Sequence, residues 1–388
     1  MNSKIKNDLL KNIQKIFNKK KNIQLHPPYL NKNDTNALIK TLESKNISTY
    51  GTTTLKFENL IRRYTGAKYV LAVNSGTSAL HLCILASGIK SGEEILIPAL
   101  NFIASSNAAI YNSSIPHYID CDFDLSINID KLSAYLQENT VIKKNKCINL
   151  NSGKVIKGII PTHVFGRISK INELKKICRK FKLIMIEDSS ESFGSFYRKK
   201  HAGTFGLCGA LSFNGNKIIT TGGGGAVLTN SKRVYEKAKY LASTSKKIIN
   251  NFSKHDQCGF NYRMPSLNAA LGISQLKKIK FIKKIKKENH LNYEKVLNQK
   301  SLYTFLKDKD FVKSSSNYWL NYIVFKNKKS LNNDFFTFFE KKKIEVRRIW
   351  SLNNTGKFYK KYPKMDLKIS KYLEKRILCL PSGIYKKI

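Results

Sequence analysis

Short apolar runs alternate with segments of helical spacing between residues 69 and 228. The runs cover 69–73, 94–97, 117–119, 155–160, 183–186, 210–213 and 226–228. A short apolar run followed by a turn and a helical segment is typical of a strand in a largely parallel α/β sheet. The pattern therefore predicts such a sheet, with helices on its faces and ligand sites at the carboxyl ends of its strands.

Beyond residue 230 the pattern changes to long helices. A helical repeat over 265–297 is carried by Ile273, Leu276, Ile279, Ile282 and Ile285. Strand-like alternation follows over 318–325 and 344–350, which predicts a smaller α+β domain. We therefore expect an N-terminal segment and large domain over 1–250 and a small C-terminal domain over 251–388.

The charge balance is extreme in a chain of otherwise ordinary composition. Of 388 residues, 41% are hydrophobic and 11% aromatic, as expected of a folded protein. Seventy Lys and Arg residues against 26 Asp and Glu give a net charge of +44. Such a surface attracts phosphates, so a nucleic-acid-binding protein is one interpretation. The lysines are spread along the chain without a recognised binding motif, which makes that interpretation the weaker one.

Seven cysteines lie far apart and form no Cys-x-x-Cys pair. This spacing predicts reduced thiols in a cytoplasmic protein, without a disulfide framework or a metal site. The apolar stretches are too short to cross a bilayer. Residues 1–21 are polar and rich in lysine, which disfavours a secretory signal. We expect a cytoplasmic protein with no membrane segment and no bound metal.

Two segments where strands give way to turns offer a phosphate site and an acid. Segment 74–80 (NSGTSAL) opens a predicted helix, whose free backbone N–H groups can hold a phosphate. By itself it is more often an ordinary helix cap. Segment 183–191 (LIMIEDSSE) is a buried strand that ends in acids. A carboxylate there can pair with a protonated heteroaromatic nitrogen, although a turn aspartate is the ordinary alternative.

Two later segments offer a lysine and an aromatic turn. Segment 209–225 presents Lys217 between apolar residues and glycines, where reduced hydration would favour a Schiff base with an aldehyde. Most lysines in so basic a chain are solvated. Segment 259–265 (GFNYRMP) is a polar and aromatic turn, and by itself it indicates a plain helix entry. The four segments together supply what one cofactor needs.

In this order and spacing, the segments resemble the pyridoxal phosphate (PLP)-dependent sugar aminotransferases of the DegT/DnrJ/StrS family. The resemblance runs from 25–28 (LHPP) to 380–382 (LPS) and includes 267–272 (LNAALG). It implies the α/β fold type I of the aspartate aminotransferase superfamily, with a mostly parallel central sheet and a smaller C-terminal α+β domain. It also implies PLP as the cofactor.

The resemblance implies a role for each matching residue. Lys217 matches the lysine that forms the Schiff base with the cofactor and moves the proton, and Asp188 matches the acid paired with the pyridine nitrogen. Glu191 falls where most relatives have a glutamine near the phenolic oxygen. The other cofactor-binding matches are Gly76, Thr77 and Ser212 at the phosphate, Phe102 on the ring, and Asn261, which would reach the phosphate in a neighbouring subunit.

The shared site implies a homodimer, with L-glutamate as the amino donor and a nucleotide keto-sugar as the acceptor. The nearest likeness is to the branch that aminates UDP-linked 4-keto-6-deoxy-N-acetylhexosamines on the way to bacillosamine or legionaminic acid. It rests on 115–117 (IPH), 212–225 (SFNGNKIITTGGGG), 255–256 (HD) and the pair Arg347 and Trp350. Amination of a dTDP- or GDP-linked sugar at C3 or C4 is the alternative. Dehydratases of the family have histidine at the lysine position, so Lys217 favours amination.

The substrate-binding residues are the part of the site that the sequence motifs define least. Candidates are His163, Arg263 and Arg347, although a lone histidine is more often structural. Asn101 replaces the usual threonine and Arg348 a common proline. These departures leave the predicted cofactor site intact and concern the substrate pocket.

Overall fold

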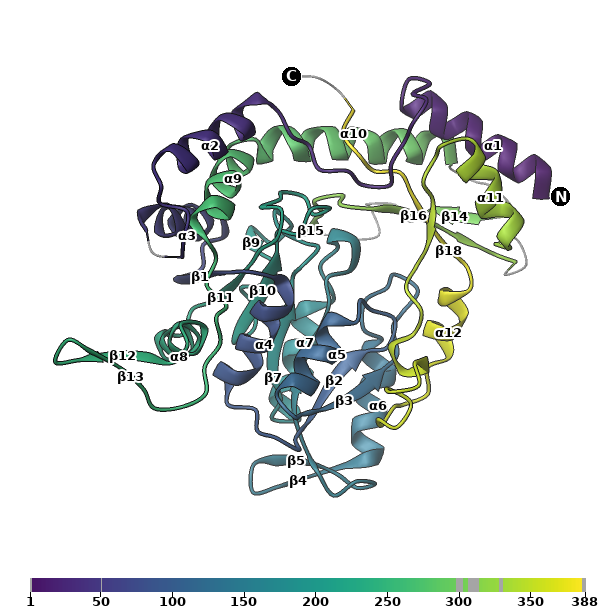
Figure 1. Cartoon of the computed structure of the whole chain (residues 1–388). Helices are drawn as coiled ribbons and strands as arrows, with labels where there is room; N and C mark the ends of the chain where they lie inside the picture. The colour runs from purple at the N-terminus through teal and green to yellow at the C-terminus, as the bar shows by residue number, and fades with distance from the viewer. Residues whose placement is uncertain (1, 50, 298–302, 306–313, 328–330, 386–388) are drawn as a thin grey trace.

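The computed structural model describes residues 2–49, 51–297, 303–305, 314–327 and 331–385. Figure 1 shows how the elements are arranged. The helices are α1 (Asn2–Ile16), α2 (Lys32–Glu43), α3 (Thr52–Thr65), α4 (Gly76–Ser87), α5 (Ala104–Tyr111), α6 (Ile129–Asn139), α7 (Ile171–Lys180), α8 (Lys232–Ala242), α9 (Ser266–Lys277), α10 (Ile279–Leu297), α11 (Asn333–Lys341) and α12 (Lys368–Glu374), with short 3-10 turns η1 (Val164–Gly166) and η4 (Asn353–Thr355).

The strands fall into one large sheet and several small ones. The large sheet contains β1 (Tyr69–Val73), β2 (Glu94–Pro98), β3 (Ile115–Ile119), β4 (Thr140–Lys143), β5 (Lys146–Asn149), β6 (Val155–Ile159), β7 (Ile184–Asp188), β10 (Cys208–Ser212) and β11 (Gly225–Thr229). The small sheets contain β8 (Phe196–Tyr197), β9 (Lys200–His201), β12 (Lys246–Ile249), β13 (Phe252–His255), β14 (Tyr303–Phe305), β15 (Ser314–Ser315), β16 (Asn321–Phe325), β17 (Arg347–Arg348) and β18 (Ile377–Leu380).

The main path of the large sheet has the order β1-β11-β10-β7-β6-β2-β3. Neighbours from β10 to β3 pair in parallel, whereas β11 runs antiparallel to both β1 and β10. Each of the seven apolar runs found in the sequence carries one of these strands, so the predicted α/β class with a mostly parallel sheet is confirmed. The parallel arrangement brings the carboxyl ends of β7 and β10 to one edge.

Alternation along the strands places helices on both faces of this sheet. In β1, Leu71 and Val73 belong to a core formed with α4, α5 and α8. Val70 and Ala72 point the other way and pack with α3, α9 and α10. The period of two in side-chain direction explains why one short strand serves two cores. Fully apolar strands are what burial on both faces requires.

The helical repeat over 265–297 forms two helices instead of one. Helix α9 ends at Lys277, and α10 begins at Ile279. Between them Lys278 adopts a cap conformation, and its backbone N–H donates to the Gln275 carbonyl at 3.0 Å. Its ammonium turns back to Asp34, in the first turn of α2. The break contains no proline or glycine. We therefore attribute it to this tertiary contact and not to a helix-breaking residue.

A smaller antiparallel sheet, in the order β14-β16-β18-β17, lies at the end of the chain. The predicted strand near 318–325 is present as β16, but only two residues of 344–350 form a strand. One face of this sheet shares a core with α1 and α11, so the first helix of the chain packs with its last third. Figure 1 shows α1 beside α11, on the same side as β14 and β18. The division at residue 250 remains a prediction.

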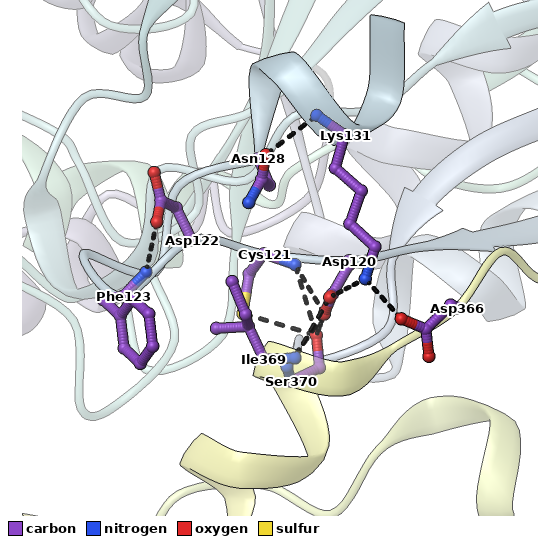
Figure 2. A network of polar contacts seen from close by, with 9 residues as sticks. All are labelled: Asp120, Cys121, Asp122, Phe123, Asn128, Lys131, Asp366, Ile369 and Ser370. Atoms are coloured by element: carbon purple, nitrogen blue, oxygen red, sulfur yellow. Dashed lines mark hydrogen bonds and ion pairs between the residues drawn. The ribbon is translucent and has the colours of Figure 1, made fainter. Parts of the chain in front are cut away.

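A polar junction joins the large sheet to α12. Asp120, just after β3, is buried and accepts hydrogen bonds from the backbone N–H groups of Ile369 and Ser370 at 3.1 and 2.8 Å (Figure 2). The Ser370 hydroxyl and the Lys131 ammonium donate to the same carboxylate at 2.5 and 2.8 Å. Lys131 also pairs with Asp366 at 2.7 Å. Because a carboxylate complements the positive end of a helix dipole, Asp120 caps α12 from the other part of the chain.

A bilayer-spanning helix is absent from the part of the chain that the structure describes, since none of its helices combines the needed length with enough apolar residues.

Candidate active site

A cavity of about 380 Å³ opens at the carboxyl ends of β7 and β10, beside the first turn of α4. Its lining combines predicted site residues from the large sheet with residues from the C-terminal part, namely Gly76, Thr77, Phe102, Glu191, Ser212, Lys217, Trp319, Arg347 and Trp350. The position agrees with the rule that open α/β sheets bind ligands beyond the carboxyl ends of their strands.

The first turn of α4 forms one end of the cavity. Ser75 caps the helix, and its hydroxyl accepts the backbone N–H of Ser78 at 3.0 Å. Gly76 packs so closely on β10 that an added Cβ would lie 2.8 Å from the Cβ of Ser212. The close approach brings a hydroxyl next to a helix N-terminus, where backbone N–H groups lack intrahelical partners. This end of the cavity suits a phosphate.

Lys217 lies in the turn that follows β10. Its backbone N–H donates to the Asn214 carbonyl at 3.0 Å, which fixes the turn. The ammonium lies 3.4 Å from Oε1 of Glu191 and 4.3 Å from the ring centre of Trp319. Only 13% of the side chain is exposed, so most of its stem is shielded from water. A shielded lysine at the wall of a cavity is suited to Schiff-base chemistry.

Glu191 is the acid next to this lysine. It is buried, and its second carboxylate oxygen accepts the backbone N–H of Phe165 at 2.9 Å. Burial raises the pKa of Glu191, although the nearby Lys217 charge and the Phe165 hydrogen bond act in the opposite direction. The acid is therefore easier to protonate than an ordinary glutamate.

Asp188 ends β7 and is held rigidly. The Ser105 hydroxyl donates to Oδ2 at 2.7 Å, and the backbone N–H of Ser190 donates to Oδ1 at 3.1 Å. The side chain is buried, and the cavity lining includes Ser190 but not Asp188. An aspartate fixed in this way beneath the lining residues can stabilise a positive charge placed above it.

His163 lies outside the cavity, which corrects the expectation that it lines a substrate cleft. It is fully buried, and its Nε2 lies 2.9 Å from Oε2 of Glu187. Burial alone would raise the pKa of Glu187, but the bond with His163 and the backbone N–H groups of Gly203 and Gly206 lower it overall. The sequence pattern could not separate the two cases, because a strand end carries inward and cavity-facing positions side by side.

Asn261 and Arg263 line a second hollow, of about 440 Å³, together with Lys239 and residues near the hairpin β12–β13. Arg263 lies 3.6 Å from Glu58, whose pKa is raised by burial. The Arg263 Nε is buried without a hydrogen-bond partner among the described residues. The two hollows are neighbours, because the Asn74 amide, in the first lining, donates to the Asn261 carbonyl at 3.3 Å. Within one chain, Asn261 and Arg263 are separate from the Lys217 cavity.

Sequence reasoning missed Trp319. The residue falls in a segment that indicated only a strand, and it comes into the cavity from the C-terminal part. Both tryptophans of the chain, Trp319 and Trp350, line this one cavity. The rarity of tryptophan in this chain could have marked both residues as candidates, but only the tertiary structure brings both indoles into the cavity of Lys217.

The residues present fit a PLP molecule. The phosphate end is the α4 turn with Ser212, the covalent anchor is Lys217, and the acid beneath is Asp188. Oδ1 of Asn216, in the cavity lining, is buried without a hydrogen-bond partner among the described residues. Phe102 is 52% exposed at the cavity and presents an apolar ring. A free acceptor and an exposed ring in one cavity are features of a ligand site.

This fold and cavity define a PLP-dependent transferase of fold type I. The chain belongs to the DegT/DnrJ/EryC1/StrS aminotransferase family, whose model matches residues 28–385. It is therefore an enzyme, a PLP-dependent nucleotide-sugar aminotransferase, as the sequence resemblance implied.

Several relatives are similar over most of the chain. The UDP-4-amino-4,6-dideoxy-N-acetyl-beta-L-altrosamine transaminase of Campylobacter jejuni subsp. jejuni serotype O:23/36 is 32% identical, over 74% of this chain and 72% of that protein. The GDP-perosamine synthase of Escherichia coli O157:H7 is 33% identical, over 72% of each. Among solved structures, Helicobacter pylori PseC, an aminotransferase involved in the biosynthesis of pseudoaminic acid, has a TM-score of 0.81 and 26% identity, covering 93% of each chain.

Proposed function

We propose that this protein moves an amino group from L-glutamate to the C4 keto group of a UDP-linked 4-keto-6-deoxy-N-acetylhexosamine. The observation that carries the proposal is the position of Lys217, which is shielded in a cavity between Glu191 and Trp319, with the first turn of α4 in the same lining. The name of the Campylobacter relative supports a UDP-linked amino sugar.

Each residue would have a defined task at the cofactor. Bound PLP supplies an electron sink for the carbon that gains or loses the amino group. Lys217 would bond covalently to the cofactor and, when released, accept or donate a proton at its Nζ. Asp188, fixed by Ser105, would keep a proton on the ring nitrogen. The α4 turn and Ser212 would bind the phosphate, Phe102 would cover one face of the ring, and Glu191 would lie near its phenolic oxygen.

The substrate side of the cavity carries positive charge. Arg347 lines it and is exposed, so its guanidinium can meet a carboxylate or a phosphate. The overall charge of +44 would attract a nucleotide diphosphate from solution. A GDP-linked keto-sugar is a second candidate substrate, because the GDP-perosamine synthase of Escherichia coli is as similar as the UDP-sugar relatives.

A homodimer with shared active sites is part of this proposal. The hairpin β12–β13 projects from the body of the chain (Figure 1). It exposes Ile248 and Phe252 by 71% and 73%, which is unusual for large apolar side chains. The hollow with Asn261 and Arg263 lies near the base of this hairpin. A second copy docked at the hairpin would therefore place its Lys217 cavity close to Asn261 and Arg263 of the first copy. Light scattering tests this, because a monomer at micromolar concentration would contradict it.

The location of the protein completes the proposal. All seven cysteines are free, and six of them are buried. Unpaired thiols are typical of a reducing compartment, which supports the cytoplasm.

The decisive experiment replaces Lys217 with alanine. The variant should fold, lose the visible absorbance of covalently bound cofactor, and lose turnover by at least about three orders of magnitude. Borohydride reduction of the wild type followed by peptide mapping should place the label on Lys217. A matched control is Lys232→Ala, a change at a side chain that is 73% exposed.

Substrate choice is measured separately. The purified enzyme is incubated with glutamate and a panel of UDP-, GDP- and dTDP-linked keto-sugars, and products are read by mass spectrometry. Amination of the UDP-linked N-acetyl sugar alone supports the proposal, whereas a preference for a GDP-linked sugar would replace it with the second candidate. A label on a lysine other than Lys217 would overturn the assignment of the site.

A further inference from the structure

Trp319 contacts the turn of Lys217 in two ways. Its indole N–H donates to the Asn216 carbonyl at 2.7 Å, which holds the peptide just before the lysine. Its ring centre lies 4.3 Å from the Lys217 ammonium, well inside the range of a cation–π interaction. One side chain thus holds both the backbone and the reactive end of Lys217.

Trp319 is itself held at both its indole ring and its backbone. His26 stacks on it with ring centres 5.1 Å apart and an interplanar angle of 24°. The backbone N–H of Trp319 donates to Oδ1 of Asn317 at 2.9 Å, and the backbone carbonyl of Trp319 accepts the buried Lys286 ammonium at 3.1 Å. These contacts come from the N-terminal segment, the strand region before β16 and helix α10. The indole is therefore a rigid part of the cavity wall.

The backbone beside Trp319 supports a functional reading. Tyr318 has a φ of 54°, in the left-handed region that bulky residues rarely adopt. Phe165 has the same φ of 54°. Its ring centre lies 6.1 Å from that of the same indole, and its backbone N–H donates to Glu191. Left-handed non-glycine residues cost free energy and persist where the surrounding structure imposes them. Tyr318 directly precedes Trp319, and Phe165 bonds to Glu191, so both left-handed residues adjoin a residue that contacts Lys217.

A purely structural tryptophan is the competing explanation. Trp319 is 1% exposed and would help any core. A core role accounts for a hydrogen bond from the buried indole N–H, but it does not require an ammonium over the ring. Trp350, the other tryptophan of the cavity, packs on Phe165 at 5.3 Å, and no cation–π contact to a lysine is found for it within the described residues. The two indoles thus provide a natural comparison.

We propose that Trp319 is a positioning residue for Lys217, which it holds through the Asn216 carbonyl and through the face of its ring. The reactive lysine of the large sheet is then aligned by a residue of the C-terminal part. This inference rests on the proposed role of Lys217, because only a reactive lysine gives such alignment a function.

The test measures the reactivity of Lys217 without using the cofactor. The full-length chain is freed of cofactor by hydroxylamine, which releases a Schiff-base-bound aldehyde, and is then dialysed. It is labelled with trace acetic anhydride at a fixed pH and analysed by peptide mass spectrometry relative to the exposed Lys232. Trp319→Leu should increase the labelling rate of Lys217 by about five-fold, because the ammonium loses its aromatic partner. Trp319→Phe keeps an aromatic face but loses the N–H bond, so it should give a smaller increase. Trp350→Leu should leave the rate unchanged.

The outcomes separate the possible explanations. Unchanged labelling in a folded Trp319→Leu protein, or an equal increase in Trp350→Leu, would overturn the inference. If Trp319→Leu does not fold, Trp319→Phe decides, since a rate equal to the wild type contradicts a positioning role. Because no cofactor enters this measurement, the inference can hold or fail independently of borohydride trapping at Lys217.

Discussion

The α12 junction and the Lys217 cavity both join the large sheet to the C-terminal part of the chain, and they differ in how their polar groups are satisfied. At the α12 junction, Asp120 accepts three backbone N–H groups, a hydroxyl and an ammonium (Figure 2). At the cavity, Glu191 and Lys217 face each other at 3.4 Å as a loose pair, and Oδ1 of Asn216 in the same lining has no hydrogen-bond partner in the part of the chain that the structure describes. The Asp120 carboxylate is surrounded by donors, whereas the polar groups of the cavity can still bind a ligand.

The difference separates a structural site from a reactive one. A buried carboxylate surrounded by donors stabilises the fold, and nothing about it requires a ligand. A loose acid–lysine pair next to a free acceptor and an exposed ring has unused capacity for a substrate or cofactor. Variants of Asp120 should therefore affect stability, and variants of the cavity should affect chemistry.

The largest effect on stability is expected for Asp120→Ala. The change leaves buried N–H groups at the start of α12 without an acceptor and should cost about 3 kcal/mol in the free energy of unfolding, measured by urea titration. Asp366→Ala is the matched control, because that acid shares Lys131 but has a side chain that is 64% exposed; it should cost less than about 1 kcal/mol. Equal losses in the two variants would remove the contrast between the junctions.

A pH-dependent effect is expected at His26, which stacks on the cavity residue Trp319. Burial lowers the pKa of His26 to about 3, against 6.5 for an ordinary histidine. The unfolded chain binds this proton below pH 6.5 and the folded chain does not, so His26 contributes stability above 6.5 that is lost as the pH falls toward 3. Going from pH 7 to pH 5 should cost about 2 kcal/mol through this residue alone.

His26→Phe tests this directly, because it keeps a ring against Trp319 and removes the titrating group. The free energy of unfolding of the variant should fall less steeply below pH 6.5 than that of the wild type. His81 and His201, whose pKa values burial lowers to about 4, remain in both proteins as an internal reference. Parallel curves for the two proteins would show that His26 is not buried as described.

The smallest effect on stability is expected for Glu191→Gln. Burial raises the pKa of Glu191, so its charged form is less favourable in the folded protein, and its contribution to stability declines as the pH rises through the folded value. A glutamine can still accept the Phe165 N–H bond. The free energy of unfolding at pH 8 should change by less than about 1 kcal/mol. A loss as large as that of Asp120→Ala would show that the pair with Lys217 is structural.

Much of the cavity could be predicted from local sequence. Gly76, Ser212 and Lys217 each follow or end an apolar run, and the strand positions follow from a period of two that burial on both faces imposes. Asp188 could be assigned to the end of a strand for the same reason. These predictions succeed because short-range patterns encode which end of a parallel strand a residue occupies.

Other features depended on contacts between distant segments. The break at Lys278, the burial of His163 against Glu187 and the separate hollow of Asn261 leave no mark on local periodicity. Nor could a pattern indicate that α1 packs with the last third of the chain, because an amphipathic face does not specify its partner.

The sequence alone determined the order of the strands along the chain, their apolar faces and the residue types available at their ends. The tertiary structure decided which of those ends share a cavity, and it brought Trp319 to Lys217 from about a hundred residues further along the chain. The physical reason is that backbone periodicity is a local property. The desolvation and pairing that make a side chain reactive arise from neighbours that only folding brings together.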